Sequence, residues 1–233
     1  MTVKESDRVH RFDAGELRAL AARRLLAEPG ADAGDPALPV RRGDGELEAG
    51  FTGVADGESV PRPAAVLIPL VAGSAELSVL FTTRSDELPS HAGQISLPGG
   101  KVDRSDDGPV AAALRETFEE TGVAPGFVDV LGLLDTYQTR TGYRIVPVVG
   151  LVRPGFTLRP EPGEVADIFD VPLRFLMDKA NHQRHERVWK GKARQFYAMP
   201  YGERYIWGAT AGIIRNLYER LYLPDLDRSR EAT

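Results

Sequence analysis

Apolar and polar positions recur with different periods along this chain, and each period predicts a kind of element. After Asp13, leucine and alanine recur at helical spacing, which predicts a first helix over about residues 14–27. Residues 64–71 and 77–83 are apolar, β-branched runs separated by small residues, so we expect a β-hairpin. Between the first helix and this hairpin, residues 29–63 are rich in Gly, Pro, Ala and Asp, which indicates a linker or a loosely packed arm whose role the sequence leaves open.

The rest of the chain mixes strand and helix patterns in the same way. A strand is expected before the glycines at 99 and 100, and an acidic helix after them. That first strand is expected at about 94–97, further strands at about 128–137 and 144–152 and in a hairpin over 187–199, and helices at about 171–179 and 208–222. This mixed order predicts an α/β (α+β) fold in one domain, without internal repeats.

The acidic helix carries the most informative spacing. Glu116, Glu119 and Glu120 are three and four residues apart, so all three carboxylates share one face of the helix. Like charges in that arrangement repel each other, and a divalent cation opposite them would remove the repulsion. The sequence therefore predicts a metal site on this face.

The remaining positions of this helix predict how it packs. Its large apolar side chains lie on the far side from the glutamates, where we expect them to enter a core. They are Val110, Leu114 and Phe118. Asp106 or Asp107 is expected to cap the start of the helix and Gly122 to end it.

Composition narrows the class of protein. The chain has 233 residues, of which 42% are hydrophobic and 27% charged, as in an ordinary globular protein. It has no cysteine, so disulfides and thiolate metal sites are excluded. The net charge of −5 without a basic run argues against a nucleic-acid partner, and no apolar run reaches the roughly 20 residues that span a membrane. The N-terminus has no apolar signal segment, so a cytoplasmic protein is expected.

Residues 100–123 resemble the signature box of the Nudix hydrolases, in which a glycine turn leads to an Arg-Glu pair and a Glu-Glu pair. The matching positions are Gly100, Arg115, Glu116, Glu119, Glu120, Gly122 and Val123. Thr117 stands where an aliphatic residue is usual. The segment is one residue longer than the general pattern, with Asp106 at the usual Glu position, which resembles the branch that hydrolyses coenzyme A.

A second motif resembles the same branch. Residues 80–100 are similar to the segment that precedes the box in coenzyme A pyrophosphatases, and residues 206–211 also look like that branch. Pro89 replaces an arginine of the motif and Leu97 replaces a phenylalanine. The resemblance implies an α/β/α sandwich with a mixed sheet between helices. The Nudix domain is then expected at 63–223, after an N-terminal helix and arm at 1–62 and before a tail at 224–233.

The resemblance also implies roles for residues around the glycine turn. Glu116, Glu119 and Glu120 would bind Mg²⁺ or Mn²⁺ together with the backbone carbonyl of Gly99. Arg115 would pair with a glutamate and hold it in orientation. The general base is either Glu116 or Glu164, since Nudix enzymes use a box glutamate or a carboxylate on a distant loop.

The expected reaction is hydrolysis of the diphosphate bond of coenzyme A or acyl-coenzyme A, giving 3′,5′-ADP and 4′-phosphopantetheine or its acyl form. Cationic and polar side chains are candidates for holding this small nucleotide substrate. They are Arg84, His91, Gln94, Arg140 and Arg144. The alternatives are hydrolysis of another nucleoside diphosphate derivative, such as ADP-ribose or NADH, and a silent nucleotide-binding module. The resemblance further suggests a homodimer.

Overall fold

The computed structural model describes residues 10–54, 60–73, 76–88, 90–189 and 191–223. Within these residues, nine strands form a mixed sheet in the order β1-β7-β8-β2-β3-β4, with β5 paired to β2, β6 to β8 and β9 to β3. The strands are β1 (Arg42–Gly43), β2 (Arg62–Ala72), β3 (Leu77–Arg84), β4 (Ile95–Ser96), β5 (Gly99–Lys101), β6 (Val128–Leu133), β7 (Tyr137–Gln138), β8 (Tyr143–Val152) and β9 (Val165–Pro172).

A smaller antiparallel sheet, in the order β10-β11-β12, leads into the last helix. Its strands are β10 (Gln183–Trp189), β11 (Lys192–Tyr201) and β12 (Arg204–Trp207). The helices are α1 (Ala14–Arg24), α2 (Ala31–Gly34), α3 (Gly108–Thr121), α4 (Leu173–Leu176) and α5 (Gly208–Leu221), with 3₁₀ turns at Pro125–Phe127 and Lys179–Asn181.

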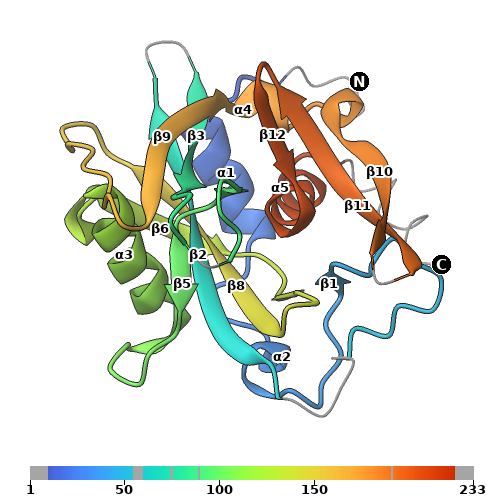
Figure 1. The fold of residues 1–233 in the computed structure, drawn as a ribbon. Coiled ribbons are helices and arrows are strands. Elements are labelled where there is room, and N and C mark those ends of the chain that lie inside the picture. Colours follow the sequence, from blue (N-terminus) through green and yellow to red (C-terminus); the bar gives the residue numbers. More distant parts are fainter. Residues whose placement is uncertain (1–9, 55–59, 74–75, 89, 190, 224–233) are drawn as a thin grey trace.

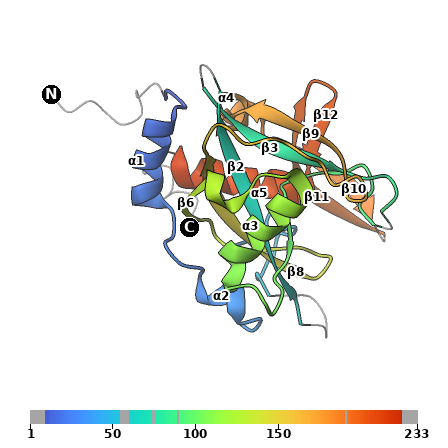
Figure 2. The same cartoon turned by 90° about the vertical axis from the view of Figure 1, so that its left-hand side faces the viewer.

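The predicted sandwich is confirmed, because helices cover both faces of the mixed sheet (Figures 1 and 2). On one face, Ala112 and Ala113 of α3 pack against Ala65 and Leu67 of β2. On the other face, α1 and α5 pack over the neighbouring positions of β2 in the larger core. The continuous apolar run of β2 is therefore explained by burial on both sides.

Strand β2 organises the sheet. It runs parallel to β8 from the pair Arg62 and Tyr143 to the pair Val71 and Val152, and antiparallel to β3 and β5. The predicted β2–β3 hairpin is thereby confirmed. Since β5 pairs with β2, the glycine turn at the start of β5 is fixed against the centre of the sheet.

The packing predicted for α3 is confirmed for Val110 and Leu114, which pack against the core around Ala65 and Leu67, but it is wrong for Phe118. The helix buries small and polar residues against the sheet, and Phe118 is 50% exposed. The buried residues are Ala112, Ala113, Thr117, Glu120 and Thr121. Small side chains allow α3 to approach β2 and β5 closely, so Glu120 is buried and Glu116 partly buried, whereas Glu119 stays exposed. Asp107 occupies the N-cap position without a side-chain cap hydrogen bond, while Gly122 ends the helix in a left-handed conformation as predicted.

Other elements differ from their predicted bounds. The first helix ends at Arg24, and the strand predicted over 128–137 is divided into β6 and β7. Strands β9 and β12 were not predicted. The hairpin β10–β11 and helix α5 confirm the predictions for 187–199 and 208–222.

The arm pairs with the sheet through β1, which runs parallel to β7. Residues 1–9 and 55–59 of the predicted N-terminal segment, and the predicted tail at 224–233, lie outside the described residues. No helix within the described ranges is long and apolar enough to cross a membrane.

Candidate active site

In the glycine turn, Gly99 lies close to the backbone of β2 and Gly100 lies close to the Glu116 side chain of α3. Gly99 has a φ of 148°, and a Cβ at this position would lie 2.3 Å from the carbonyl oxygen of Ala65. A Cβ on Gly100 would lie 2.5 Å from the carboxylate carbon of Glu116. Only glycine fits at Gly99, because its neighbours there are backbone atoms of β2, whereas a side chain at Gly100 would displace the Glu116 carboxylate.

The register of β5 directs the backbone of Gly99 toward α3. The N–H of Leu67 bonds to the carbonyl of Pro98, and the N–H of Val102 bonds to the carbonyl of Pro63. Bonding alternates along an antiparallel ladder, so the N–H and C=O of Gly99 face away from β2. The Gly99 N–H accordingly donates to Glu120 Oε2 at 3.1 Å.

Glu116 and Glu120 lie in an environment that disfavours their charged forms. The pKa of Glu120 is raised to about 7, mainly by burial, while the Gly99 N–H and Arg84 lower it and the nearby Glu116 and Glu164 add to the rise. Burial also raises the pKa of Glu116, with Glu119 and Glu164 adding to the effect and Arg115 opposing it. Desolvation, which Arg115 and Arg84 only partly oppose, therefore disfavours the ionised form of both carboxylates.

Arg115 joins the helix to the loop before it. Its Nε and Nη2 donate to both oxygens of Asp106 at 2.9 Å, and Nη1 donates to Glu116 at 3.1 Å and Glu119 at 3.0 Å. Hydrogen bonds from Arg115 lower the pKa of Asp106. A single guanidinium thus donates to three carboxylates, forms an ion pair with a fourth, Asp103, at 3.7 Å, and positions two of the box glutamates.

Glu164 reaches the same group of charges from the segment before β9. Its backbone carbonyl accepts from the N–H of Ser85, which ties this segment to the end of β3. Its side chain is exposed and makes no hydrogen bond with a described residue. The structure therefore brings Glu164 within electrostatic range of Glu116 and Glu120, from a separate part of the chain.

Arg84, at the end of β3, is a cation with unused donors. Its charge lowers the pKa of Glu120, so its side chain lies on the α3 side of the sheet. Its Nε is buried and has no hydrogen-bond partner among the described residues. A buried donor of this kind requires an acceptor, and an anionic ligand would supply one.

The other predicted substrate residues lie away from the glutamates. His91 and Gln94 bond to each other at 2.8 Å in the exposed loop between β3 and β4. Arg140 pairs with Glu48 of the arm at 2.6 Å, and its backbone N–H donates to Asp44. Pro89 lies outside the described residues, whereas Leu97 is buried in the core.

Arg144 holds the arm and does not face the glutamates. It is 3% exposed, and it donates to Gln138 and to the carbonyls of several arm residues. The carbonyls belong to Asp32, Asp35, Pro36 and Leu38. These bonds use every nitrogen of its guanidinium, so no donor is left for a substrate.

The donor set around Gly99 fits a hard divalent cation, because carboxylate and carbonyl oxygens are the ligands that Mg²⁺ and Mn²⁺ prefer. Among the described residues, no three acidic or imidazole side chains converge into a ready cage. Glu119 instead turns to Arg115 and Glu120 to the Gly99 N–H. This arrangement suits an open site in which water and substrate oxygens complete the coordination.

Sequence reasoning missed several partners in this region. Asp167 of β9 accepts from Arg204 of β12 at 2.6 Å, and Glu48 of the arm pairs with Arg140 and Arg194. The short acidic run at 44–48, within a segment otherwise rich in small residues, is the signal that could have indicated the arm's contacts.

Comparisons with known proteins place this geometry in a family. A sequence model described as the NUDIX domain matches residues 61–190. The chain is 39% identical over 156 residues to the Nudix hydrolase NudL of Escherichia coli K12, named as uncharacterized, and the match covers 67% of this chain and 81% of that protein. NudL of Escherichia coli O1:K1 matches with the same identity and coverage.

Solved structures resemble the chain more distantly. The NUDIX domain of Shewanella oneidensis NrtR, complexed with ADP ribose, is 18% identical with a TM-score of 0.46, over 70% of this chain and 90% of that chain. The C. elegans Ap4A hydrolase is 20% identical with a TM-score of 0.42, over 48% and 80% of the two chains. Likenesses of this size leave the substrate open.

Proposed function

This chain belongs to the Nudix hydrolase family, and on that premise we propose that it hydrolyses the diphosphate bond of coenzyme A or acyl-coenzyme A. Hydrolysis of a nucleoside diphosphate derivative follows from the family. The coenzyme A substrate is supported by the motif that precedes the box, which includes Arg84, His91 and Gln94. The expected products are 3′,5′-ADP and 4′-phosphopantetheine or its acyl form.

One observation carries the proposal. Glu116 and Glu120 lie beside the Gly99 turn, and Glu164 adds a third negative charge to the group. Burial raises the pKa values of both glutamates against the opposing charges of Arg115 and Arg84, which supports a bound cation here. A divalent cation bound by Glu116, Glu119, Glu120 and the Gly99 carbonyl would supply the missing charge.

When bound, Mg²⁺ or Mn²⁺ would neutralise the phosphate oxygens and acidify water. The residues of the chain would orient the reactants. The Gly99 N–H holds Glu120, Arg115 holds Glu116 and Glu119, and Arg84 offers its unused donors to the diphosphate.

We assign the general base to Glu164 rather than Glu116. Glu116 already accepts from Arg115 and lies against Gly100, whereas Glu164 is exposed and carries no side-chain hydrogen bond to a described residue. Water attacks one phosphorus of the diphosphate, its proton passes to Glu164, and the bond to the bridging oxygen breaks. Each product then carries a phosphate group.

A turnover screen tests the proposal. The full chain is incubated with Mg²⁺ or Mn²⁺ and with coenzyme A, 3′-dephospho-coenzyme A, ADP-ribose or NADH, and products are resolved by chromatography. Preferential conversion of coenzyme A to 3′,5′-ADP supports the proposal. Preference for ADP-ribose or NADH would keep the reaction type and replace the substrate, and this alternative is favoured by the loss of the motif's arginine at Pro89.

Absence of turnover with every substrate would instead favour a silent nucleotide-binding module. Glu164→Gln tests the base separately: we expect kcat to fall about 10²- to 10⁴-fold while the KM changes little. An unchanged kcat would return the role of base to Glu116.

A further inference from the structure

Strand β4 precedes the glycine turn, and one of its two side chains faces α3. Ser96 is directly opposite Thr82 in the register with β3, so these two side chains share a face of the sheet. Thr82 follows Phe81, which belongs to the core on the α5 side, and successive side chains of a strand point to opposite faces. Thr82 and Ser96 therefore face α3, whereas Ile95, the other residue of β4, packs toward the α5 side.

The strand that carries Ser96 lies between the strands that carry Arg84 and Gly99. Strand β9 occupies one edge of β3, and β8 occupies one edge of β2. Strand β4, paired with β3, and strand β5, paired with β2, therefore both lie in the gap between β3 and β2. Arg84 is two residues beyond Thr82 on β3 and so faces α3 as well, which agrees with its effect on the pKa of Glu120.

The hydroxyl groups of Thr82 and Ser96 are joined in a way that leaves one donor for a ligand. Thr82 is 1% exposed, and its acceptors among the described residues are both on Ser96: the hydroxyl oxygen at 2.9 Å and the carbonyl oxygen at 3.4 Å. Ser96 itself is partly exposed. When Thr82 donates to the Ser96 hydroxyl oxygen, the Ser96 proton needs another acceptor, and an anion on this face would supply it.

Arg84 provides a second unused donor on the same face. Its Nε is buried and has no hydrogen-bond partner among the described residues. Phosphate oxygens accept hydrogen bonds from both guanidinium and hydroxyl groups. A neutral donor has an advantage beside Arg84, because a further cation would be attracted to Glu116, Glu120 and Glu164, which act on one another here.

We propose that Ser96 donates its hydroxyl hydrogen to a phosphate oxygen of the substrate's diphosphate, with Thr82 holding the hydroxyl in orientation and Arg84 donating beside it. The proposal rests on the proposed function for the identity of the ligand, and it adds a substrate-binding residue to that site. Glutamates face the site from α3, so donors to an anionic ligand have to come from the sheet. Ser96 and Arg84 are the donors that the α3 face of β3 and β4 offers.

Binding of methylenediphosphonate to the full chain tests the proposal without turnover, because the carbon bridge between its phosphorus atoms is not hydrolysed. Calorimetry in the presence of Mg²⁺ gives the dissociation constant. We expect Ser96→Ala to weaken binding about 10- to 100-fold, the range for a hydrogen bond to a charged group. Thr82→Val removes the hydroxyl that orients Ser96 and should weaken binding about two- to tenfold, whereas Thr82→Ser should bind as the unchanged chain does.

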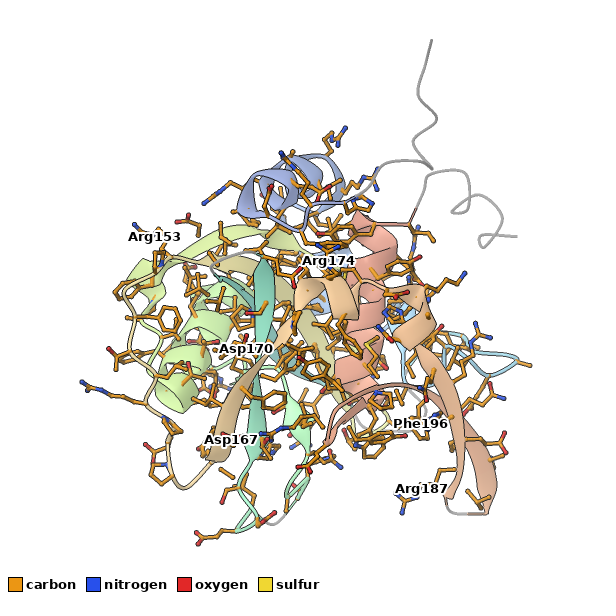
Figure 3. The ribbon with its side chains drawn as sticks, turned by 90° about the horizontal axis from the view of Figure 1, so that it is seen from above. Arg153, Asp167, Asp170, Arg174, Arg187 and Phe196 are labelled. Carbon is orange, nitrogen blue, oxygen red and sulfur yellow. The ribbon has the colours of Figure 1, made fainter. Side chains whose placement is uncertain are left out.

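A combined variant tests whether Thr82 acts through Ser96. In that case, adding Thr82→Val to Ser96→Ala weakens binding no further than Ser96→Ala alone. Thr83→Val is the control, because Thr83 is adjacent to Thr82 on β3 but faces away from α3. It is opposite Asp167 of β9, which is labelled in Figure 3, and its hydroxyl accepts from Arg204. This variant should bind methylenediphosphonate as the unchanged chain does.

Circular dichroism confirms that each variant is folded, and Ser96→Cys, a weak donor of similar shape, replaces Ser96→Ala if the latter is not. The proposal is overturned if the unchanged chain does not bind methylenediphosphonate or if Ser96→Ala binds it normally. It is also overturned if Thr83→Val weakens binding as much as Ser96→Ala does.

The same variants separate this proposal from the proposed function. Loss of methylenediphosphonate binding in Ser96→Ala, in a chain that cleaves no diphosphate, would retain the role of Ser96 and reject the reaction. Cleavage of coenzyme A with a KM that Ser96→Ala leaves unchanged would retain the reaction and reject the role of Ser96.

Discussion

The acidic residues of the arm and those of α3 differ in how many arginines pair with each carboxylate. In the arm, Glu48 is shared by Arg140 and Arg194, and Asp44 accepts from the Tyr137 hydroxyl and the Arg140 N–H. On α3 the ratio is reversed, because one arginine, Arg115, serves Asp106, Glu116 and Glu119.

Neighbouring charges separate the two clusters more clearly than burial does. Burial raises the pKa of Asp44 in the arm, and every other contribution to that pKa lowers it. For Glu116 and Glu120, burial and other glutamates act in the same direction. The arm carboxylates therefore have more cations beside them than the α3 carboxylates do, although Glu46 Oε1 and Glu48 Oε1 have no hydrogen-bond partner among the described residues.

The largest expected effect on activity comes from Glu120→Gln, which removes one charge from the α3 cluster. Under the proposed function this carboxylate binds the metal, so we expect kcat to fall by about 10²- to 10³-fold or more, as when one stabilising group at a reacting centre is lost. Steady-state kinetics with Mg²⁺ measures the fall. The fold should persist in circular dichroism, and near-normal activity would show that Glu120 binds no metal.

The pH dependence of stability sharpens the comparison. Glu120 has a raised pKa of about 7 in the folded chain and an ordinary value near 4.5 when unfolded. Unfolding therefore releases its proton between these values, and the metal-free protein should lose up to about 3 kcal/mol of stability as pH rises from about 4.5 to 7.

Urea unfolding at a series of pH values measures this loss. Glu120→Gln should reduce the slope, and saturating Mn²⁺ should restore stability at pH 8, because the metal binds the ionised carboxylates. A slope that Glu120→Gln leaves unchanged would place its origin in other groups, such as Asp44 and Glu46, whose pKa values burial also raises.

Arg84→Ala tests the cation that acts on Glu120. We expect KM to rise about 10- to 100-fold, the range for a hydrogen bond to a charged group. The rise should be equal for coenzyme A and 3′-dephospho-coenzyme A, because Arg84 lies beside Glu120 and would meet the diphosphate. Arg104→Ala, at an exposed position in the loop before α3, is the control. A rise confined to coenzyme A would place Arg84 at the 3′-phosphate.

Glu48→Gln tests the ion pairs of the arm and should have the smallest effect on activity. It leaves Arg140 and Arg194 without their shared partner at a half-buried site, and we expect a loss of about 1–2 kcal/mol, between the values for exposed and buried pairs. Urea denaturation measures it against Glu28→Gln, an exposed position. A kcat reduced as strongly as in Glu120→Gln would contradict a purely structural arm.

Much of the fold was predictable because its elements have strong local patterns. The apolar runs of β2 and β3 and the helical stripe of α5 stand out in the sequence. Strand β9 was missed because its burial comes from pairing with β3 across a long separation in sequence. The bounds of β6 and β7 were missed because the strand pairing with β8 is interrupted between Leu133 and Tyr137.

The orientation of α3 shows a limit of periodicity. Large apolar residues predicted the buried face, yet Phe118 is exposed and Glu120 is buried. Close approach to the sheet favours Ala and Thr over Phe, and the Gly99 N–H offers the glutamate a partner inside. The three glutamates were identified from spacing, but the opposite fates of Arg84 and Arg144 depend on contacts with distant segments.

The parallel pairing of β2 with β8 has a consequence for how this protein folds. Their first registered residues, Arg62 and Tyr143, are roughly eighty positions apart in the chain. Such long-range pairing is slow because a large loop must close before any contact compensates for the lost entropy. The glycine turn pairs with β2 and α3 packs against it, so both depend on a strand that is fully paired only after β8 has formed. During synthesis, Glu116, Glu119 and Glu120 emerge before the strand that completes their support, and a nascent chain ending before β8 would carry the signature residues without the geometry described for them.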